Sequence, residues 1–289
     1  MKSLFRKILK LLLQFYPVEY GKYTILEKIY FPFLAPSQPK NVISSIRAGI
    51  KMNLDIREYI QSTLYLFGHY ELPLMKYIEK NVKESQVVFD IGANVGFLTL
   101  TFSKQAKKNG KVYAFEPEPK NFKKLQENVL LNNFQNISLN NFAISSINDK
   151  LKLYLSDDNN FGTHSLVNER NNSENYVNVD TVKLDDFVFQ NNIKKIDWMK
   201  IDVEGAELDV VNGAKKTLID LKPNLIIEVI SENMKKRGLS SVLFKKMMLD
   251  EFAYFPFLIN NSGKLLEDSA DNENNSENLV FIHKSNLKK

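Results

Sequence analysis

The stretch Val87-Val-Phe-Asp-Ile-Gly92-Ala-Asn94-Val-Gly96 decides the fold. Its first half is a short run of apolar and β-favouring residues, which suits a strand buried on both faces. Gly92 follows at once and tolerates the positive φ of a tight turn. Residues 94–108 then have a helical pattern that stops at Asn109-Gly110, a typical C-terminal stop. The stretch therefore predicts a strand, a glycine turn and a helix.

Similar strand-and-helix units follow along the chain. The pattern predicts further strands at 111–116, 137–144, 197–202 and 225–230, and helices at 119–131, 206–221 and 240–251. Strands that alternate with helices form right-handed crossovers and a parallel sheet. Residues 253–259 and 278–284 are expected to close the sheet as an antiparallel pair. The sequence thus predicts an α/β fold with a seven-stranded, mostly parallel sheet, and short additional strands at 151–155 and 176–184.

The acid that ends the second strand indicates a cofactor that contains a nucleoside. Glu116 lies twenty residues beyond Gly96, and an acid in this place accepts hydrogen bonds from both hydroxyls of a ribose. The glycine spacing differs from the G-x-G-x-x-G pattern of nicotinamide cofactors, and the sequence has no G-x-x-x-x-G-K-[ST] phosphate loop. Asp90, just before the glycines, suits a cofactor with an ammonium group. S-adenosylmethionine has that group and lacks phosphate, so the sequence predicts this cofactor.

Three motifs together resemble the FkbM family of S-adenosylmethionine-dependent methyltransferases. They are DIGANVG at 90–96, AFEPEP at 114–119 and KIDVEGAE at 200–207. The resemblance runs from about Gly68 to Val229. It implies a class I methyltransferase (Rossmann-like) fold and O-methylation, commonly of sugar hydroxyls in glycans or surface polysaccharides. Polyketide-type natural products are the alternative acceptors.

The resemblance also implies which residues hold the cofactor. The methionine portion would contact Asp90, Gly92, Asn94 and Gly96, and the ribose would contact Glu116. The adenine would lie between Asn141 and Phe142, which follow the third strand. The remaining two candidates for cofactor contact are Glu71, within Gly68-His-Tyr-Glu71, and Asp202.

Acidic residues also end the two strands where an acceptor would meet the methyl group. Asp202 ends the fourth strand, Glu228 lies near the end of the fifth, and Glu204 follows Asp202 in the turn. A hydroxyl must lose its proton as it attacks, and a carboxylate or a histidine within reach can accept it. We expect Asp202 and Glu204 to be catalytic, followed by Glu228 and by His164. Alternatively, Asp202 and Glu228 share a divalent metal that lowers the pKa of the hydroxyl.

Residues 1–65 are expected to form an N-terminal helical extension, and residues 66–289 the methyltransferase domain. The first seventeen residues have the apolar spacing of a helix and several basic residues on its other side. The run is too short to span a bilayer, and Lys10 interrupts it, so a cleaved signal peptide is not expected. This helix either lies on an anionic membrane or, as we favour, packs on its own domain or on a partner subunit.

Composition excludes several other classes of function. The 289 residues include no cysteine, which excludes disulfides, thiolate zinc sites and a cysteine nucleophile. The net charge is +5, and residues 1–80 hold the excess, so the main domain lacks the basic face of a nucleic-acid-binding protein. The acids at the strand ends argue against a non-catalytic partner protein that only keeps the fold.

The expected location is the cytoplasm, with the inner face of the membrane as the alternative; the oligomeric state stays open.

Overall fold

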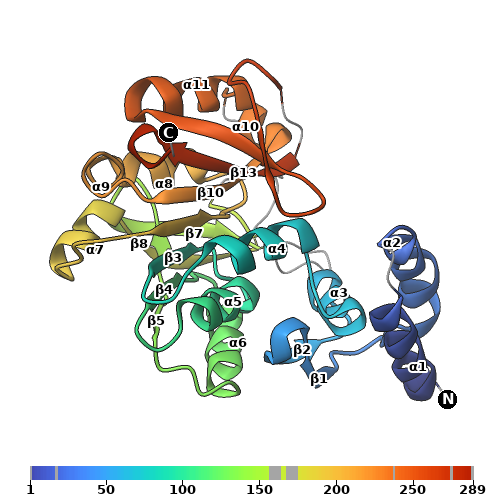
Figure 1. The fold of residues 1–289 in the computed structure, drawn as a ribbon. Coiled ribbons are helices and arrows are strands. Elements are labelled where there is room, and N and C mark those ends of the chain that lie inside the picture. Colours follow the sequence, from blue (N-terminus) through green and yellow to red (C-terminus); the bar gives the residue numbers. More distant parts are fainter. Residues whose placement is uncertain are drawn as a thin grey trace.

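A mixed, eight-stranded sheet forms the centre of the molecule (Figure 1). The computed structural model describes residues 2–16, 19–155, 164–166, 175–236, 238–273 and 276–287. The strands lie in the order β12-β11-β13-β10-β9-β3-β4-β5. From β10 to β5 they are parallel, and β13 is antiparallel to both β10 and β11. Their bounds are β3 Val87–Ile91, β4 Lys111–Phe115, β5 Ile137–Asn140, β9 Trp198–Ile201, β10 Asn224–Ile230, β11 Tyr254–Ile259, β12 Leu265–Glu267 and β13 Ser276–His283.

This sheet confirms the predicted α/β class with an antiparallel C-terminal pair. All seven expected strands are present, and β12 adds an eighth at the edge beside β11. Three residues within a polar stretch are too few to show a strand pattern in the sequence, so β12 was not expected.

Helices cover both faces of the sheet, because successive residues of a strand point to opposite sides. In β3, Phe89 and Ile91 belong to a cluster with apolar residues of α7, α8, α9 and α11. Val88, between them, belongs to a cluster on the other face with Tyr77 of α4 and Phe102 of α5. The helix bounds are α4 Leu72–Asn81, α5 Phe97–Ala106, α6 Pro119–Leu130, α7 Leu184–Gln190, α8 Glu207–Gly213, α9 Lys215–Asp220, α10 Ser231–Lys236 and α11 Ser241–Phe252.

Two predicted elements are divided in the structure. The strand expected at 137–144 leaves the central sheet after β5, and its end, β6 (Ala143–Ile144), pairs with β8 (Tyr176–Val182). Together with β7 (Asp149–Tyr154) these strands form a separate small sheet. The helix expected at 206–221 is interrupted between α8 and α9. There the backbone passes so close to Ser145 that a Cβ on Gly213 would lie 2.0 Å from the Ser145 carbonyl oxygen.

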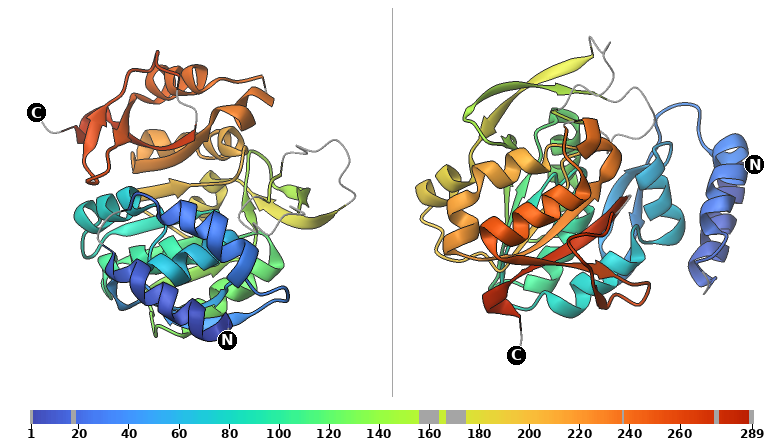
Figure 2. Two further views of the ribbon diagram at one scale, coloured as in Figure 1. Left: turned by 90° about the vertical axis from the view of Figure 1, so that its right-hand side faces the viewer. Right: turned by 90° about the horizontal axis from the view of Figure 1, so that it is seen from above.

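The N-terminal segment contains helices and a β-hairpin that packs on the sheet domain. Its elements are α1 Lys2–Phe15, α2 Lys22–Ile25, the π-helical η1 Leu26–Leu34, β1 Asn41–Ser45, the short turn η2 Arg47–Gly49, β2 Lys51–Asp55 and α3 Tyr59–Phe67; a last short turn, η3, spans Lys284–Asn286. Leu64 and Leu66 of α3 share an apolar cluster with Val95 and Leu100 beside the glycine turn. The segment therefore adjoins the edge of the sheet where β3 ends, whereas α1 and η1 lie at the periphery (Figure 2). No helix in the described ranges is long and apolar enough to cross a membrane.

Candidate active site

A cavity opens at the carboxyl ends of β3, β4, β9 and β10, the edge where open α/β sheets bind ligands. Residues of the sheet edge, of the N-terminal segment and of the small sheet line it: Ile60, Tyr70, Glu71, Ile91, Gly92, Asn94, Phe115, Glu116, Pro117, Asn121, Ala143, Ile144, Leu153, His164, Leu166, Asp202, Val203, Glu204 and Glu228. Eight of the twelve residues that the sequence singled out are among them, although they come from distant parts of the chain.

The glycine turn holds the ends of β3, β4 and β9 together. The backbone N–H groups of Gly92 and Ala93 both donate to the carbonyl oxygen of Phe115, at 3.0 and 2.9 Å. Gly92 has φ +85°, and a Cβ on it would lie 1.7 Å from the carbonyl oxygen of Asp202. Only glycine fits here, and the close approach fixes the position of the loop that carries Asp202.

Glu116 is a buried acid in the wall of the cavity. Its Oε2 accepts from the backbone N–H of Asn94 at 2.7 Å, and its Oε1 accepts from the N–H of Glu118 at 2.9 Å. Burial raises the pKa of Glu116 to about 8, although these two hydrogen bonds pull the pKa down. Each oxygen keeps a further lone pair, so the carboxylate can still accept a hydroxyl group from a ligand in the cavity.

Two candidates of the glycine turn lie beside the cavity and not in its described lining. The buried Asp90 accepts a hydrogen bond from the hydroxyl of Thr99 in α5. Gly96 has φ +94°, and a Cβ on it would lie 2.5 Å from Cδ1 of Leu125 in α6. Asp90 thus holds α5 to β3, and Gly96 makes room for α6.

The two candidates after β5 also lie outside that lining. The side-chain amide of Asn141 donates to the carbonyl oxygen of Glu116 at 2.8 Å, which connects the loop after β5 to the end of β4. The ring of Phe142 packs on Phe115, with the ring centroids 5.7 Å apart. The residues after β5 that do line the cavity are Ala143 and Ile144.

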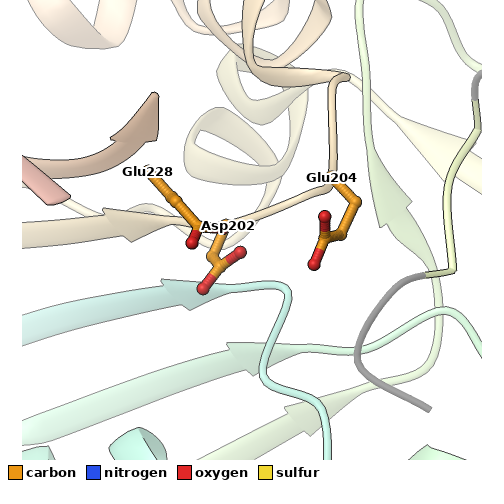
Figure 3. A group of neighbouring side chains, drawn as sticks. All are labelled: Asp202, Glu204 and Glu228. Atoms are coloured by element: carbon orange, nitrogen blue, oxygen red, sulfur yellow. The ribbon is translucent and has the colours of Figure 1, made fainter. Parts of the chain in front are cut away.

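Three carboxylates gather on the other side of the cavity. Asp202, Glu204 and Glu228 each offer an oxygen, and these oxygens lie within 4.8 Å of one another. Figure 3 shows Asp202 next to Glu228, with the carboxylate of Glu204 turned toward them. Glu204 has φ +50° and is followed by Gly205 at φ +95°, so a tight turn after β9 brings its side chain back toward the strand end.

A buried lysine that the sequence analysis did not single out neutralises part of this charge. Lys200 in β9 is fully buried, and its Nζ lies 3.0 Å from Oδ2 of Asp202. Burial alone would lower the pKa of Lys200, but the carboxylates of Asp202, Glu228 and Glu71 outweigh it and raise the pKa. Lys200 therefore carries its charge. A lone lysine in the apolar strand Trp198–Ile201 is the sequence signal that could have revealed it.

The Asp202 and Glu228 side chains share one proton. The negative charge of Asp202, followed by burial, raises the pKa of Glu228, and the two carboxyl groups form a hydrogen bond. Burial would raise the pKa of Asp202, but Lys200 and the hydrogen bond from Glu228 lower it overall. At neutral pH, Asp202 is thus the ionised member of the pair and Glu228 holds the proton.

Two further groups lie near these acids. Glu71 accepts from Nδ2 of Asn278 in β13 at 2.8 Å, and burial raises its pKa. Burial also raises the pKa of Tyr70, as do the neighbouring carboxylates, so its hydroxyl stays protonated. His164 lines the opposite part of the cavity, and burial lowers the pKa of its imidazole. An uncharged imidazole can accept a proton.

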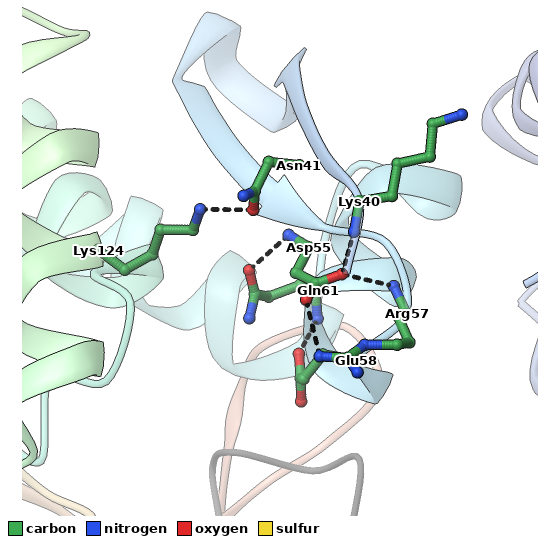
Figure 4. A network of polar contacts seen from close by, with 7 residues as sticks. All are labelled: Lys40, Asn41, Asp55, Arg57, Glu58, Gln61 and Lys124. Atoms are coloured by element: carbon green, nitrogen blue, oxygen red, sulfur yellow. Dashed lines mark hydrogen bonds and ion pairs between the residues drawn. The ribbon is translucent and has the colours of Figure 1, made fainter. Parts of the chain in front are cut away.

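A second cavity adjoins the first, between the β1–β2 hairpin and α6. It shares Asn121 and His164 with the first cavity, and most of its other lining is polar: Asn41, Asn53, Asp55, Gln61, Glu118, Lys120, Lys123, Lys124, Glu127 and Asn175, with Val95 and Leu155. Figure 4 shows how hydrogen bonds order this wall: Nζ of Lys124 donates to Oδ1 of Asn41 at 2.7 Å, and the N–H of Asp55 donates to Oε1 of Gln61 at 2.8 Å.

Known proteins resemble part of this chain. It is 28% identical to "Methyltransferase 1" of Beauveria bassiana over 50% of this chain and 65% of that protein. It is 26% identical to "Hexuronic acid methyltransferase AglP" of Haloferax volcanii (63% and 71%), and 28% identical to "2-O-methyltransferase NoeI" of Sinorhizobium fredii (47% and 60%). The chain thus spans less than two thirds of the first and the third of these relatives.

Among solved structures, that of Methyltransferase FkbM from Methylobacillus flagellatus aligns with 68% of this chain and 43% of its own chain, at 16% identity and a TM-score of 0.44. The model of the methyltransferase FkbM domain matches residues 90–257, which is more than half of the chain. With the glycine turn, Glu116 and the acids after β9 in one cavity, the chain belongs to the FkbM family of S-adenosylmethionine-dependent methyltransferases.

Proposed function

We propose that the protein transfers a methyl group from S-adenosylmethionine to a hydroxyl of a sugar in a glycan or surface polysaccharide. The observation that carries the proposal is the placement of Asp202, Glu204 and Glu228 in the same cavity as the glycine turn and Glu116. The names of two relatives add support, because one gives a hexuronic acid as substrate and the other gives O-methylation.

The residues present suit S-adenosylmethionine. Glu116 would accept the ribose hydroxyls, while Glu71 and Asp202 would face the ammonium of the methionine portion. Leu153 and Leu166 add apolar surface for a purine ring. The bound cofactor supplies an electrophilic methyl group, and much of the catalysis is then the alignment of the acceptor oxygen with that group.

Asp202 is the first choice for the catalytic base. A sugar hydroxyl is a weak nucleophile, and its proton must go to a group within hydrogen-bond reach. Asp202 is ionised, lies at the cavity wall and is held in place by Lys200 and Glu228. Glu204 is the second choice, and His164, on the opposite side, is the third.

A divalent metal between Asp202, Glu204 and Glu228 is the alternative to a simple base. Carboxylate oxygens suit Mg²⁺ or Mn²⁺, and a bound ion would lower the pKa of the acceptor hydroxyl. The charge of Lys200 and the proton of Glu228 already offset the negative charge of this group, which favours the base. Activity that survives a chelator would support the base, whereas activity lost to a chelator and restored by Mg²⁺ would support the metal.

The second cavity supports an acceptor with many hydroxyl groups. Its amides, carboxylates and lysines offer both donors and acceptors of hydrogen bonds, and it adjoins the first cavity at Asn121 and His164. A glycan longer than one sugar would place its remaining sugars there. Lys124→Met should then raise KM for the acceptor and leave the affinity for S-adenosylhomocysteine unchanged.

Methyl transfer from radiolabelled S-adenosylmethionine tests the function. The acceptor panel would hold neutral sugars, hexuronic acids, oligosaccharides, polyketide-type alcohols and RNA. We expect label on a sugar, stable to alkali, because a methyl ether survives conditions that hydrolyse a methyl ester. Transfer only to a polyketide-type alcohol would overturn the sugar assignment. Binding of S-adenosylhomocysteine without transfer to any acceptor would favour a non-catalytic protein.

A further inference from the structure

The N-terminal helix α1 packs on the protein with a side that carries both polar residues and Leu13. Nε of Arg6 donates to the carbonyl oxygen of Leu34 at 2.7 Å, and Nζ of Lys10 donates to Oγ of Ser44 at 2.5 Å. Residues 6, 10 and 14 lie on one face of a helix, and the third of them, Gln14, contacts the backbone of α3. The helix does pack on its own domain, as we favoured from the sequence, but the packed face holds Arg6, Lys10 and Gln14 beside Leu9 and Leu13 and leaves the broader apolar stripe outside.

The apolar face of α1 is consequently exposed. Six of its eight apolar residues are between 44% and 83% exposed: Leu4, Phe5, Ile8, Leu11, Leu12 and Phe15. The other two, Leu9 and Leu13, pack on the domain. By helical spacing these six residues form one stripe, directly opposite Arg6 and Lys10. Ile29 and Phe33 of the neighbouring η1 are exposed as well. A continuous apolar stripe of this kind marks an interaction surface, whereas single exposed apolar residues do not.

The same segment carries the net positive charge of the protein. Residues 1–40 hold seven basic and two acidic residues, and the remaining 249 residues hold 32 of each. Lys2, Arg6 and Lys40 line a small cavity between α1 and residues 35–40, and none of the described residues that line it is acidic. Lys7 and Lys28 are also exposed. A partner for this face must therefore offer apolar contact and negative charge together.

We propose that the exposed face of α1, defined by Leu4, Phe5, Ile8, Leu11, Leu12 and Phe15, docks on an anionic lipid membrane. A helix of 14 residues cannot span the bilayer, so it would lie in the interface with its apolar side toward the acyl chains. The flanking lysines would meet lipid phosphates. A second copy of the chain is a poorer fit, because it would bring the same positive charge to the contact. The proposal does not depend on the acceptor or on the catalytic residues.

Vesicle sedimentation with the full chain tests the proposal. The chain should pellet with vesicles of phosphatidylcholine and phosphatidylglycerol, less with phosphatidylcholine alone, and less at high salt. The double variant Leu12→Asp/Phe15→Asp should lower the bound fraction about tenfold or more. The matched control is Leu130→Asp/Phe189→Asp, at two positions on α6 and α7 that are exposed to a similar degree (77% and 82%, against 64% and 83%).

The results distinguish docking of this face on a membrane from docking on a second copy of the chain. The control variant should bind vesicles like the unmodified chain, and both variants should keep its melting temperature, since all four side chains are exposed. A chain that stays in the supernatant with anionic vesicles overturns the proposal, and so does equal binding by Leu12→Asp/Phe15→Asp. A dimer, seen by sedimentation velocity without lipid and dissociated by the same double variant, would assign the face to a second copy and also overturn it.

Discussion

At the scale of single residues, Glu116 accepts a hydrogen bond from Asn94 in the glycine turn and is proposed to hold the ribose of the cofactor. The Glu116→Gln variant keeps the shape of the side chain but loses the charge that strengthens hydrogen bonds from ribose hydroxyls. At pH 8.5, where Glu116 is mostly ionised, we expect S-adenosylhomocysteine to bind about 1–3 kcal/mol more weakly to the variant, measured by titration calorimetry. Because the pKa of Glu116 is raised to about 8, affinity should also increase between neutral pH and pH 8.5 in the unmodified chain and not in the variant.

The control for this prediction is Glu127→Gln. Glu127 lies on α6 and lines the second cavity, and it is not among the described residues that line the first, so its neutralisation should leave the affinity for the cofactor unchanged. Equal affinity of Glu116→Gln and the unmodified chain would remove Glu116 from the cofactor site.

Asp202 allows a separate test of the chemical step. We expect Asp202→Asn to lower turnover by roughly 10²-fold or more, because the amide cannot accept the proton of the acceptor hydroxyl. Affinity for S-adenosylhomocysteine should change only a few-fold, because Glu71 would still face the ammonium group. Glu204→Gln should lower turnover less than Asp202→Asn does, because Asp202 and not Glu204 is the proposed base. Turnover of Asp202→Asn like that of the unmodified protein, on any accepted substrate, would contradict the assignment.

The acids around the cavity could be predicted from the sequence, but the cation among them could not. Asp202 and Glu228 were found because they end apolar strands, where an unneeded charge is costly. Lys200 lies two residues before Asp202, within β9, and its role depends on the proximity of Asp202, Glu228 and Glu71. Proximity of this kind is set by packing between strands, which a single sequence does not reveal.

At the scale of elements, the turn between β3 and α5 depends on Gly92. An alanine there would have to adopt φ +85° and place its Cβ 1.7 Å from the carbonyl oxygen of Asp202. Gly49 has φ +74° with open space around it, so Gly49→Ala measures the backbone strain alone, about 1–2 kcal/mol. We expect Gly92→Ala to cost a further ~1–3 kcal/mol in urea unfolding, because backbone atoms must move. Equal costs for the two variants would contradict the close approach.

Elements with a clear pattern were predicted, and those fixed by contacts were not. The apolar runs of β3, β4, β9 and β10 are buried on both faces, so the sequence shows them directly. The break between β5 and β6 has no such signal. Ala143 and Ile144 are apolar, and an apolar pair suits a strand of the small sheet as well as one of the large sheet. The pattern of α1 correctly predicted a helix, but the face that packs holds Arg6 and Lys10 beside Leu13, and the broader apolar stripe is exposed.

At the scale of the whole molecule, several buried acids make stability depend on pH. Burial raises the pKa of Glu58 and Glu207 to about 7, of Asp90 to about 6 and of Glu116 to about 8. Between their ordinary values and these raised values, the folded protein holds protons that the unfolded chain has released. The free energy of unfolding must then fall as pH rises.

This linkage predicts that the protein is more stable near pH 5 than near pH 8. An acid whose pKa is raised in the folded protein contributes its full stability below the pKa of the unfolded chain. That contribution is lost as pH rises through the folded pKa, which for Glu116 means from about pH 4.5 to about pH 8. Urea unfolding at several pH values measures the slope. Glu207→Gln keeps an oxygen that can accept from the N–H of Gly205 but cannot ionise, so it should flatten the fall between about pH 4.5 and 7. A free energy of unfolding that rises over this range, or an unchanged slope in Glu207→Gln, would show that these acids are ionised in the folded protein.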